Sequence, residues 1–139
     1  MALSYSVPFE TSVPEGFEIG TVLKIRGVVP SQANRFYINL LSCDKPDSDI
    51  VLHFNPRLDQ SIVVMNTKEC GTWGSEERVF PNVFQRGHSF ELLLIAMNER
   101  FKIVVGDSES YEFIYRLPPK RSCLLKVDGD VSLDLLKIF

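Results

Sequence analysis

The sequence has few of the residues that bind metals or form disulfides. It contains three cysteines, Cys43, Cys70 and Cys123, and two histidines, His53 and His88. The cysteines are odd in number and lack metal-ligand spacing, so we interpret them as reduced thiols. The histidines are too few and too widely separated for a zinc site. No metal or other cofactor is therefore expected.

Net positive charge and long apolar runs are also missing. The formal net charge is -3, whereas a bulk electrostatic attraction to nucleic acid needs the opposite sign. The one dense basic stretch, residues 116–121, contains two prolines and is interpreted as a solvated turn. No segment is long enough to span a bilayer, and the first residues lack a signal-peptide pattern. We expect a protein made in the cytosol, with no nucleic-acid partner and no membrane insertion.

What the sequence does contain is a regular β pattern. Its 139 residues are 45% hydrophobic, which fits one domain with a sizeable core. Apolar residues recur with a period of two or form short β-branched runs, and Gly, Pro, Asn and Asp separate them. The expected strands cover residues 22–26, 35–40, 50–55, 63–65, 90–95, 101–105, 111–115 and 131–139. This pattern predicts an all-β fold, either a sandwich or a barrel.

The domain organisation is simple, because no internal repeat or linker divides the chain. Residues 1–15 include Pro8 and Pro14 and are interpreted as a loosely attached N-terminal arm. Residues 16–139 are expected to form the single folded domain.

A row of polar side chains follows one expected strand. Side chains alternate between the two faces of a strand, so His53, Asn55 and Arg57 point the same way. Phe54 and Pro56 point the other way and can join the core. The first three residues form a row of hydrogen-bonding groups about 7 Å apart. Polar residues on the outer face of an antiparallel sheet are ordinary by themselves.

Two further segments carry the same chemistry. Asn66 ends a β-branched run, and after a glycine-containing loop come Trp73, Glu76 and Arg78. Glu76 and Arg78 share a face by parity, and Glu77 takes the opposite one. If these segments are neighbours, one polar patch results, which Arg35, Tyr37 and Asn39 could extend. Such a patch suits a sugar, because hydroxyls need donors and acceptors and a pyranose needs a flat apolar partner.

The spacing of these residues resembles the carbohydrate-recognition motif of the galectins. The residues are His53-x-Asn55-x-Arg57, Val64-x-Asn66 and Trp73-Gly74-x-Glu76-x-Arg78. The resemblance continues through residues 20–27, 35–36, 84–87, 104–107 and 129–139, and it is strongest to a short, single-domain member of the family. It implies an antiparallel jelly-roll β-sandwich over residues 16–139, with the site on its concave face.

The resemblance also assigns roles at the galactose end of a glycan. It implies that His53, Asn55 and Arg57 hold the axial 4-hydroxyl of a β-galactoside, and that Asn66 and Glu76 hold the 6-hydroxyl. Family members need no metal.

The remaining implied contacts extend beyond these hydroxyls. Trp73 would stack under the galactose ring, Arg57, Glu76 and Arg78 would reach the next sugar, and Arg35 would touch extended glycans. The partners implied are β-galactoside glycans such as lactose or N-acetyllactosamine, carried on glycoproteins that a homodimer cross-links. The family is cytosolic and nuclear and leaves cells without a signal peptide.

Four further expectations accompany this one. Relatives often carry an acid near position 62 that helps to order the arginines, where this chain has Ile62. A protein that uses the same scaffold for protein contacts, with sugar binding weak or lost, is the alternative. A glycosidase is not expected, because Glu76 and Glu77 point apart, whereas hydrolysis needs two facing carboxylates. If His53 acts as a neutral group, binding is expected to weaken below about pH 6.5.

Overall fold

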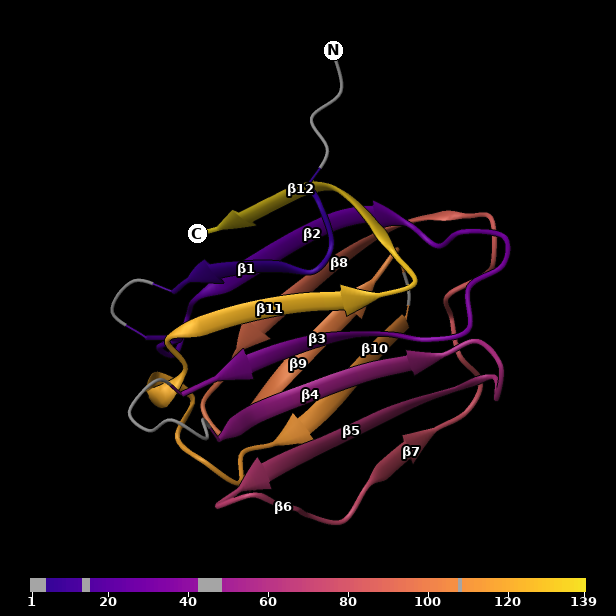
Figure 1. Ribbon diagram of the computed structural model, residues 1–139. Coiled ribbons are helices and arrows are strands. Elements are labelled where there is room, and N and C mark those ends of the chain that lie inside the picture. The colour runs from indigo at the N-terminus through magenta and orange to yellow at the C-terminus, as the bar shows by residue number, and fades with distance from the viewer. Residues whose placement is uncertain (1–4, 14–15, 43–48, 108) are drawn as a thin grey trace.

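The fold is an all-β sandwich of two antiparallel sheets, a jelly roll (Figure 1). The computed structural model describes residues 5–13, 16–42, 49–107 and 109–139. Over these residues one sheet has seven strands in the order β1-β11-β3-β4-β5-β6, with β7 also paired to β5. The other has five strands in the order β10-β9-β8-β2-β12. The period-two pattern of the sequence therefore predicted the fold class correctly.

The strands of the seven-stranded sheet are β1 (Phe9–Ser12), β3 (Phe36–Leu41), β4 (Ile50–Arg57), β5 (Ile62–Glu69), β6 (Thr72–Trp73), β7 (Glu77–Val79) and β11 (Leu124–Gly129). Those of the five-stranded sheet are β2 (Val22–Val28), β8 (Ser89–Ala96), β9 (Arg100–Val105), β10 (Glu109–Ile114) and β12 (Ser132–Ile138). A single 3-10 turn, η1 (Pro119–Arg121), is the helical element of the part described. None of the helical structure within that part is long and apolar enough to span a membrane.

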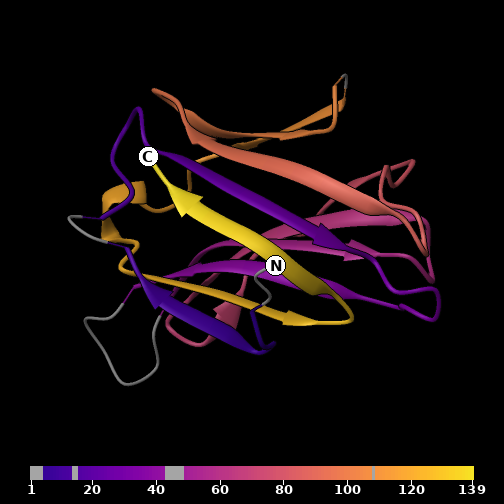
Figure 2. The ribbon, with the colours of Figure 1, turned by 90° about the horizontal axis from the view of Figure 1, so that it is seen from above.

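The core lies between the two sheets, which Figure 2 shows as separate layers. Aromatic residues join them: Phe54 of β4 meets Tyr111 of β10 edge-on at 5.5 Å between ring centroids, and Phe36 of β3 stacks on Phe90 of β8 at 5.8 Å. Full burial of such a side chain contributes roughly 1.5–3 kcal/mol. Because Phe54 is 2% exposed on the inner face of β4, the residues that flank it in sequence must face outward.

The N-terminal segment is held more firmly than the sequence suggested. Phe9–Ser12 form β1, which pairs antiparallel with β11, and Tyr5 makes an isolated bridge to Leu133. The rings of Tyr5 and Phe9 also meet edge-on at 5.1 Å. The expectation of a loose attachment is wrong for these residues, because β11, which supplies their partner, was not recognised as a strand. The division of the chain into an arm and a domain stays a prediction.

The cysteines are not all free. Cys70 is an exposed free thiol in the turn between β5 and β6. Cys123 is disulfide-bonded, which corrects the expectation of a reduced thiol at that position. Cys43 lies outside the described residues.

Candidate functional site

Strand register gathers the predicted site residues on the outer face of the seven-stranded sheet. His53 of β4 pairs with Asn66 of β5, and on its other side with Asn39 of β3. Directly paired residues in adjacent strands share a face, so these three side chains form a row across the sheet. Trp73 pairs with Lys68 of β5 and lies at the end of the same face. Figure 1 shows β4, β5, β6 and β7 side by side along one edge of this layer.

A hollow of about 450 Å³ opens among these side chains. It is lined by His53, Arg57, Asn66, Trp73, Gly74 and Glu76. A hollow of similar volume, about 480 Å³, lies elsewhere, between Phe84, His88 and Asp134. Of these two hollows, the first is lined by the predicted residues, including the indole of Trp73. We take that one as the candidate site.

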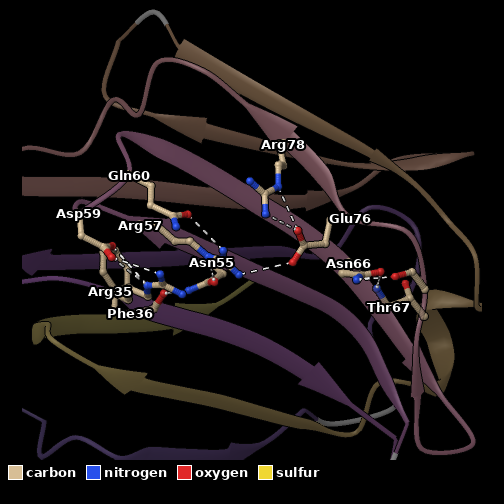
Figure 3. A network of polar contacts seen from close by, with 11 residues as sticks. Arg35, Phe36, Asn55, Arg57, Asp59, Gln60, Asn66, Thr67, Glu76 and Arg78 are labelled. Atoms are coloured by element: carbon tan, nitrogen blue, oxygen red, sulfur yellow. Dashed lines mark hydrogen bonds and ion pairs between the residues drawn. The ribbon is translucent and has the colours of Figure 1, made fainter.

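Arg57 is the most constrained side chain of the site (Figure 3). Its Nε donates to Asn55 Oδ1 at 2.9 Å, one terminal nitrogen donates to Gln60 Oε1 at 3.2 Å, and the other donates to Glu76 Oε2 at 3.4 Å. Its side chain is 14% exposed. A guanidinium has five N–H groups, so two remain for a ligand. These contacts fix the direction in which they point.

Glu76 lies between two arginines. Its Oε2 accepts from Arg57, and its Oε1 accepts from Arg78 Nε at 3.0 Å and is 2.9 Å from a terminal nitrogen of Arg78 (Figure 3). Glu77, the next residue, faces the other way and pairs with Arg116 at 3.1 Å. The predicted opposition of the two glutamates is therefore confirmed, and each carboxylate has a cation as its partner. The two arginines fix the orientation of the Glu76 carboxylate, whose oxygens accept hydrogen bonds.

The two asparagines are buried and oriented. Asn55, 6% exposed, donates from Nδ2 to Phe36 O at 2.7 Å while its Oδ1 accepts from Arg57. Asn66, 3% exposed, donates from Nδ2 to Gly74 O at 2.9 Å, and its Oδ1 accepts the Thr67 N–H at 2.8 Å. Buried amides with such partners cannot rotate without leaving polar atoms unpaired. They are fixed points of the site.

His53 is held as a neutral acceptor. Its Nδ1 lies 2.6 Å from Asn39 Oδ1, and since a carbonyl oxygen only accepts, Nδ1 carries the proton and Nε2 carries a lone pair. Burial, assisted by the positive charge of Arg57, lowers the pKa of His53 from 6.5 to about 4. The expected weakening below about pH 6.5 is therefore wrong for this side chain, because burial delays its protonation by more than two pH units.

Trp73 supplies the broad apolar surface. Its side chain is 44% exposed, and its ring lies 4.9 Å from the His53 ring, centroid to centroid, with 57° between the planes. Lys68 Nζ lies 5.4 Å from the indole centroid. A large aromatic ring left half exposed beside buried hydrogen-bonding groups is typical of a ligand platform rather than of a core residue.

Arg35 lies beyond Arg57 and does not line the hollow. It forms an isolated bridge with Arg57, and its guanidinium holds Asp59 with two of its nitrogens, at 3.1–3.3 Å (Figure 3). These hydrogen bonds hold the pKa of Asp59 below its usual range. Five of the eight predicted residues thus line the hollow. Asn55 and Arg78 contact two of these five, Arg57 and Glu76, and Arg35 lies beside Arg57. The further neighbours Tyr37 and Asn39 continue the row, with the Tyr37 ring 5.6 Å from that of His53.

Sequence reasoning missed two partners of the site, Gln60 and Arg116, and one ion pair away from the site, that of Arg121. Gln60, rather than an acid at position 62, takes the third donor of Arg57. Arg116 contacts Asn66, Ser75 and Glu77, and Arg121 pairs with the buried Asp49 at 2.8 Å. The interpretation of residues 116–121 as a solvated turn is therefore wrong for both arginines. No local pattern reveals the contacts of Arg116 and Arg121, because 39 to 72 positions separate these arginines from their partners.

Clusters of metal ligands do not occur in the described ranges: no group of three or more His, Cys, Asp or Glu side chains converges there. What converges instead is a set of fixed donors (Arg57, Asn66), fixed acceptors (Glu76, His53) and one aromatic ring. This set can form hydrogen bonds to several hydroxyl groups at once while the ring covers an apolar face.

Comparison with known proteins places the chain in a class. Residues 8–138 match the family model of the galactoside-binding lectins, and the chain belongs to this family, the galectins. It is accordingly a carbohydrate-binding lectin and not an enzyme. Among its relatives are galectin-7 of Mus musculus, 56% identical over 94% of this chain and 96% of the relative, and galectin-7 of Homo sapiens, 54% identical over 96% and 98%.

Solved structures agree with the fold. A galectin of Caenorhabditis elegans, LEC-6, superimposes with a TM-score of 0.89 and 32% identity, covering 98% of this chain and 93% of that one. Sheep galectin-11, solved in complex with glycerol, gives 0.89 with 26% identity, covering 98% and 100%. The resemblance to the galectins stated from the motif is thus confirmed. The expected likeness to a short member of the family agrees with the galectin-7 relatives, which this chain covers over 96–98% of their length.

Proposed function

We propose that the hollow binds the terminal galactose of lactose- and N-acetyllactosamine-type glycans. The observation that carries this proposal is the way in which three protein acceptors fix the Arg57 guanidinium. Three protein acceptors hold the guanidinium, so its two remaining N–H groups point in fixed directions beside a half-exposed indole. A ligand with hydroxyls on one side and an apolar face on the other matches both features.

The axial 4-hydroxyl is assigned to His53, Asn55 and Arg57. His53 Nε2 accepts the hydroxyl proton and Arg57 donates to the hydroxyl oxygen, with Asn55 fixing the guanidinium from beneath. An equatorial 4-hydroxyl would leave these buried groups without a partner, which costs about 1–3 kcal/mol for each group. The site should therefore prefer galactose to glucose.

The 6-hydroxyl is assigned to Asn66 and Glu76, which offer one donor and one acceptor from neighbouring walls of the hollow. The apolar face of the galactose ring is assigned to Trp73. The following sugar is assigned to Arg57, Glu76 and Arg78, whose charges are already paired. Arg35, held by Asp59 at the far side, is assigned to extended glycans.

At the level of the cell we propose a homodimer that cross-links glycoproteins. Support comes from family membership and from galectin-7 relatives matched over nearly their whole length. The proposed locations are the cytoplasm, the nucleus and, by a route without a signal peptide, the cell exterior.

Single-site affinity should be weak, roughly -4 to -6 kcal/mol, because the ligand is small and the hollow is open. Two sites on one particle would raise avidity.

The deciding experiment is a titration with lactose that follows tryptophan fluorescence, with maltose as the control. Trp73 is the only tryptophan of the chain, so the fluorescence reports on the site alone. Saturation with lactose and no response to maltose is the expected result. No response to either sugar would favour the alternative, a lectin scaffold used for protein contacts.

A further inference from the structure

Arg116 connects the five-stranded sheet to the wall of the hollow. It lies two residues beyond the end of β10, and its guanidinium lies 4.9 Å from the Phe113 ring centroid. From there it reaches residues 74–76, the segment that joins β6 to β7. One of its terminal nitrogens donates to Ser75 O at 2.8 Å and to Glu77 Oε2 at 3.1 Å.

Its second contact determines the orientation of Asn66. The other terminal nitrogen of Arg116 donates to Asn66 Oδ1 at 2.9 Å, and Thr67 N–H donates to the same oxygen at 2.8 Å. Both lone pairs of Oδ1 are therefore used. Nδ2 donates one hydrogen to Gly74 O, which leaves a single N–H of this buried amide for the hollow that it lines.

Gly74 is the residue that permits this approach. A Cβ at position 74 would lie 2.9 Å from an Arg116 terminal nitrogen and 3.2 Å from Asn66 Oδ1. Both distances are shorter than ordinary van der Waals contact. The absence of a side chain therefore lets the guanidinium reach under the segment that carries Glu76, with Trp73 immediately before it.

We propose that Arg116 is a positioning residue of the galactoside site, acting on the galactose 6-hydroxyl through Asn66 and the 74–76 segment. Arg116 does not touch the sugar. It turns the Asn66 amide so that a donor faces the hollow, and it holds the backbone that places Glu76 opposite that donor. This inference rests on the proposed function and specifies which residue outside the hollow sets one of its contacts.

The test compares lactose with 6'-deoxylactose, which lacks only the galactose 6-hydroxyl, in wild type and in Arg116→Met. Methionine keeps an unbranched apolar stem but cannot donate a hydrogen bond. We expect the affinity of the variant for lactose to fall about tenfold, the loss typical of one misplaced hydrogen-bond pair. Its affinity for 6'-deoxylactose should change less than twofold, so the preference for the 6-hydroxyl disappears.

Two variants accompany this test. Arg100→Met removes a comparable arginine, paired with Glu112 at 3.5 Å at the same edge of the five-stranded sheet, and should leave both affinities at wild-type values. Arg116→Lys keeps one charge but cannot contact Asn66 and Ser75 together, so its loss for lactose should be intermediate. If Arg116→Met does not fold, Arg116→Lys takes its place in the comparison of the two sugars.

The outcomes separate the two proposals. Equal losses for both sugars would mean that Arg116 supports the fold alone, and unchanged preference in both Arg116 variants would overturn its role. A wild-type protein that binds neither sugar would overturn the proposed function, and the positioning role with it. A wild type that binds lactose no better than 6'-deoxylactose would refute the role while leaving galactoside binding intact.

Discussion

The outer faces of the two sheets each carry an arginine–glutamate pair, but the two arginines differ in burial and in the number of their contacts. On the five-stranded sheet, Arg26 and Glu91 are directly paired residues of β2 and β8, 3.2 Å apart, with side chains 50% and 45% exposed. On the seven-stranded sheet, Arg57 and Glu76 lie 3.4 Å apart, but Arg57 is 14% exposed. The second arginine also contacts two amides, whereas the first has no contact of that kind among the contacts described. Burial and fixed neighbours, not the charges themselves, therefore distinguish a binding site from a solvated sheet surface.

The largest expected difference between the faces comes from removing Arg57 or Trp73. Arg57→Ala deletes the donors at the centre of the hollow, and Trp73→Ala deletes its platform. We expect each variant to pass through a lactose column without retention, because a charge-assisted contact contributes about 1.5–3 kcal/mol. Circular dichroism should show that the fold survives.

Arg26→Ala is the matched control for this comparison, since it removes the same side-chain type from the other face. It should be retained like wild type. Retention of either Arg57→Ala or Trp73→Ala would contradict the site assignment.

The next effect is a pH dependence that belongs to the seven-stranded face. Because the pKa of His53 is lowered to about 4, its Nε2 stays an acceptor from pH 8 down to pH 5, and lactose affinity should be constant there. Affinity should fall as pH approaches 4, when Nε2 gains a proton. A midpoint near pH 6.5 in the fluorescence titration would contradict this assignment.

The same group affects stability. Unfolded His53 takes up a proton near its ordinary pKa of 6.5, and the folded protein resists it until about 4. The stability contributed by the neutral form is therefore complete above pH 6.5 and is lost as pH falls from there to 4. Urea unfolding at pH 7 and pH 5 should show a smaller difference in His53→Gln than in wild type.

A smaller effect is expected at Gln60, whose exposed amide contacts Arg57. Gln60→Ala should weaken lactose binding about two- to fivefold, the effect of one partly solvated hydrogen bond. Ile62 is directly paired with Arg57 across β4 and β5. Ile62→Glu in the Gln60→Ala background should therefore recover the affinity, since a carboxylate there can order the guanidinium instead. Unchanged affinity in Gln60→Ala would show that Asn55 and Glu76 suffice.

The smallest effect is expected at Glu91 on the five-stranded face. Glu91→Gln removes an exposed partner of Lys24 and Arg26 and should leave the urea midpoint of unfolding at its wild-type value, because solvent screens exposed ion pairs. Lactose affinity should not change. A loss comparable to that of Gln60→Ala would mean that the two faces are coupled.

The sequence predicted the parts of this molecule that depend on strand parity. Parity alone placed His53, Asn55 and Arg57 together and sent Glu76 and Glu77 to opposite sides. It could not show that Asn39 fixes the His53 tautomer or that Gln60 holds Arg57, because these contacts depend on register and loop shape. The contact of Arg116 with Asn66 could not be predicted for a further reason. Arg116 follows a strand of the other sheet and is 50 positions from Asn66 in the sequence.

The N-terminal segment shows the same limit. Residues near Phe9 carry little β pattern of their own, and only the neighbouring β11 gives them a partner. The expected strands also left out β11 itself, which lies between β1 and β3 in the sheet. Long-range pairing, rather than local propensity, decided both elements.

The contacts of Arg57 with Asn55, Gln60 and Glu76 have a consequence for the rates at which a sugar binds and leaves. A side chain that is already held needs no ordering when ligand arrives, so association should proceed without a conformational step. With single-site affinity near 100 µM and an association rate of about 10⁷ M⁻¹s⁻¹, a bound galactoside would leave within roughly a millisecond. Each complex with a single galactoside would be short-lived. Lasting adhesion would depend on how quickly a released galactoside is replaced by its neighbour on the same glycoprotein.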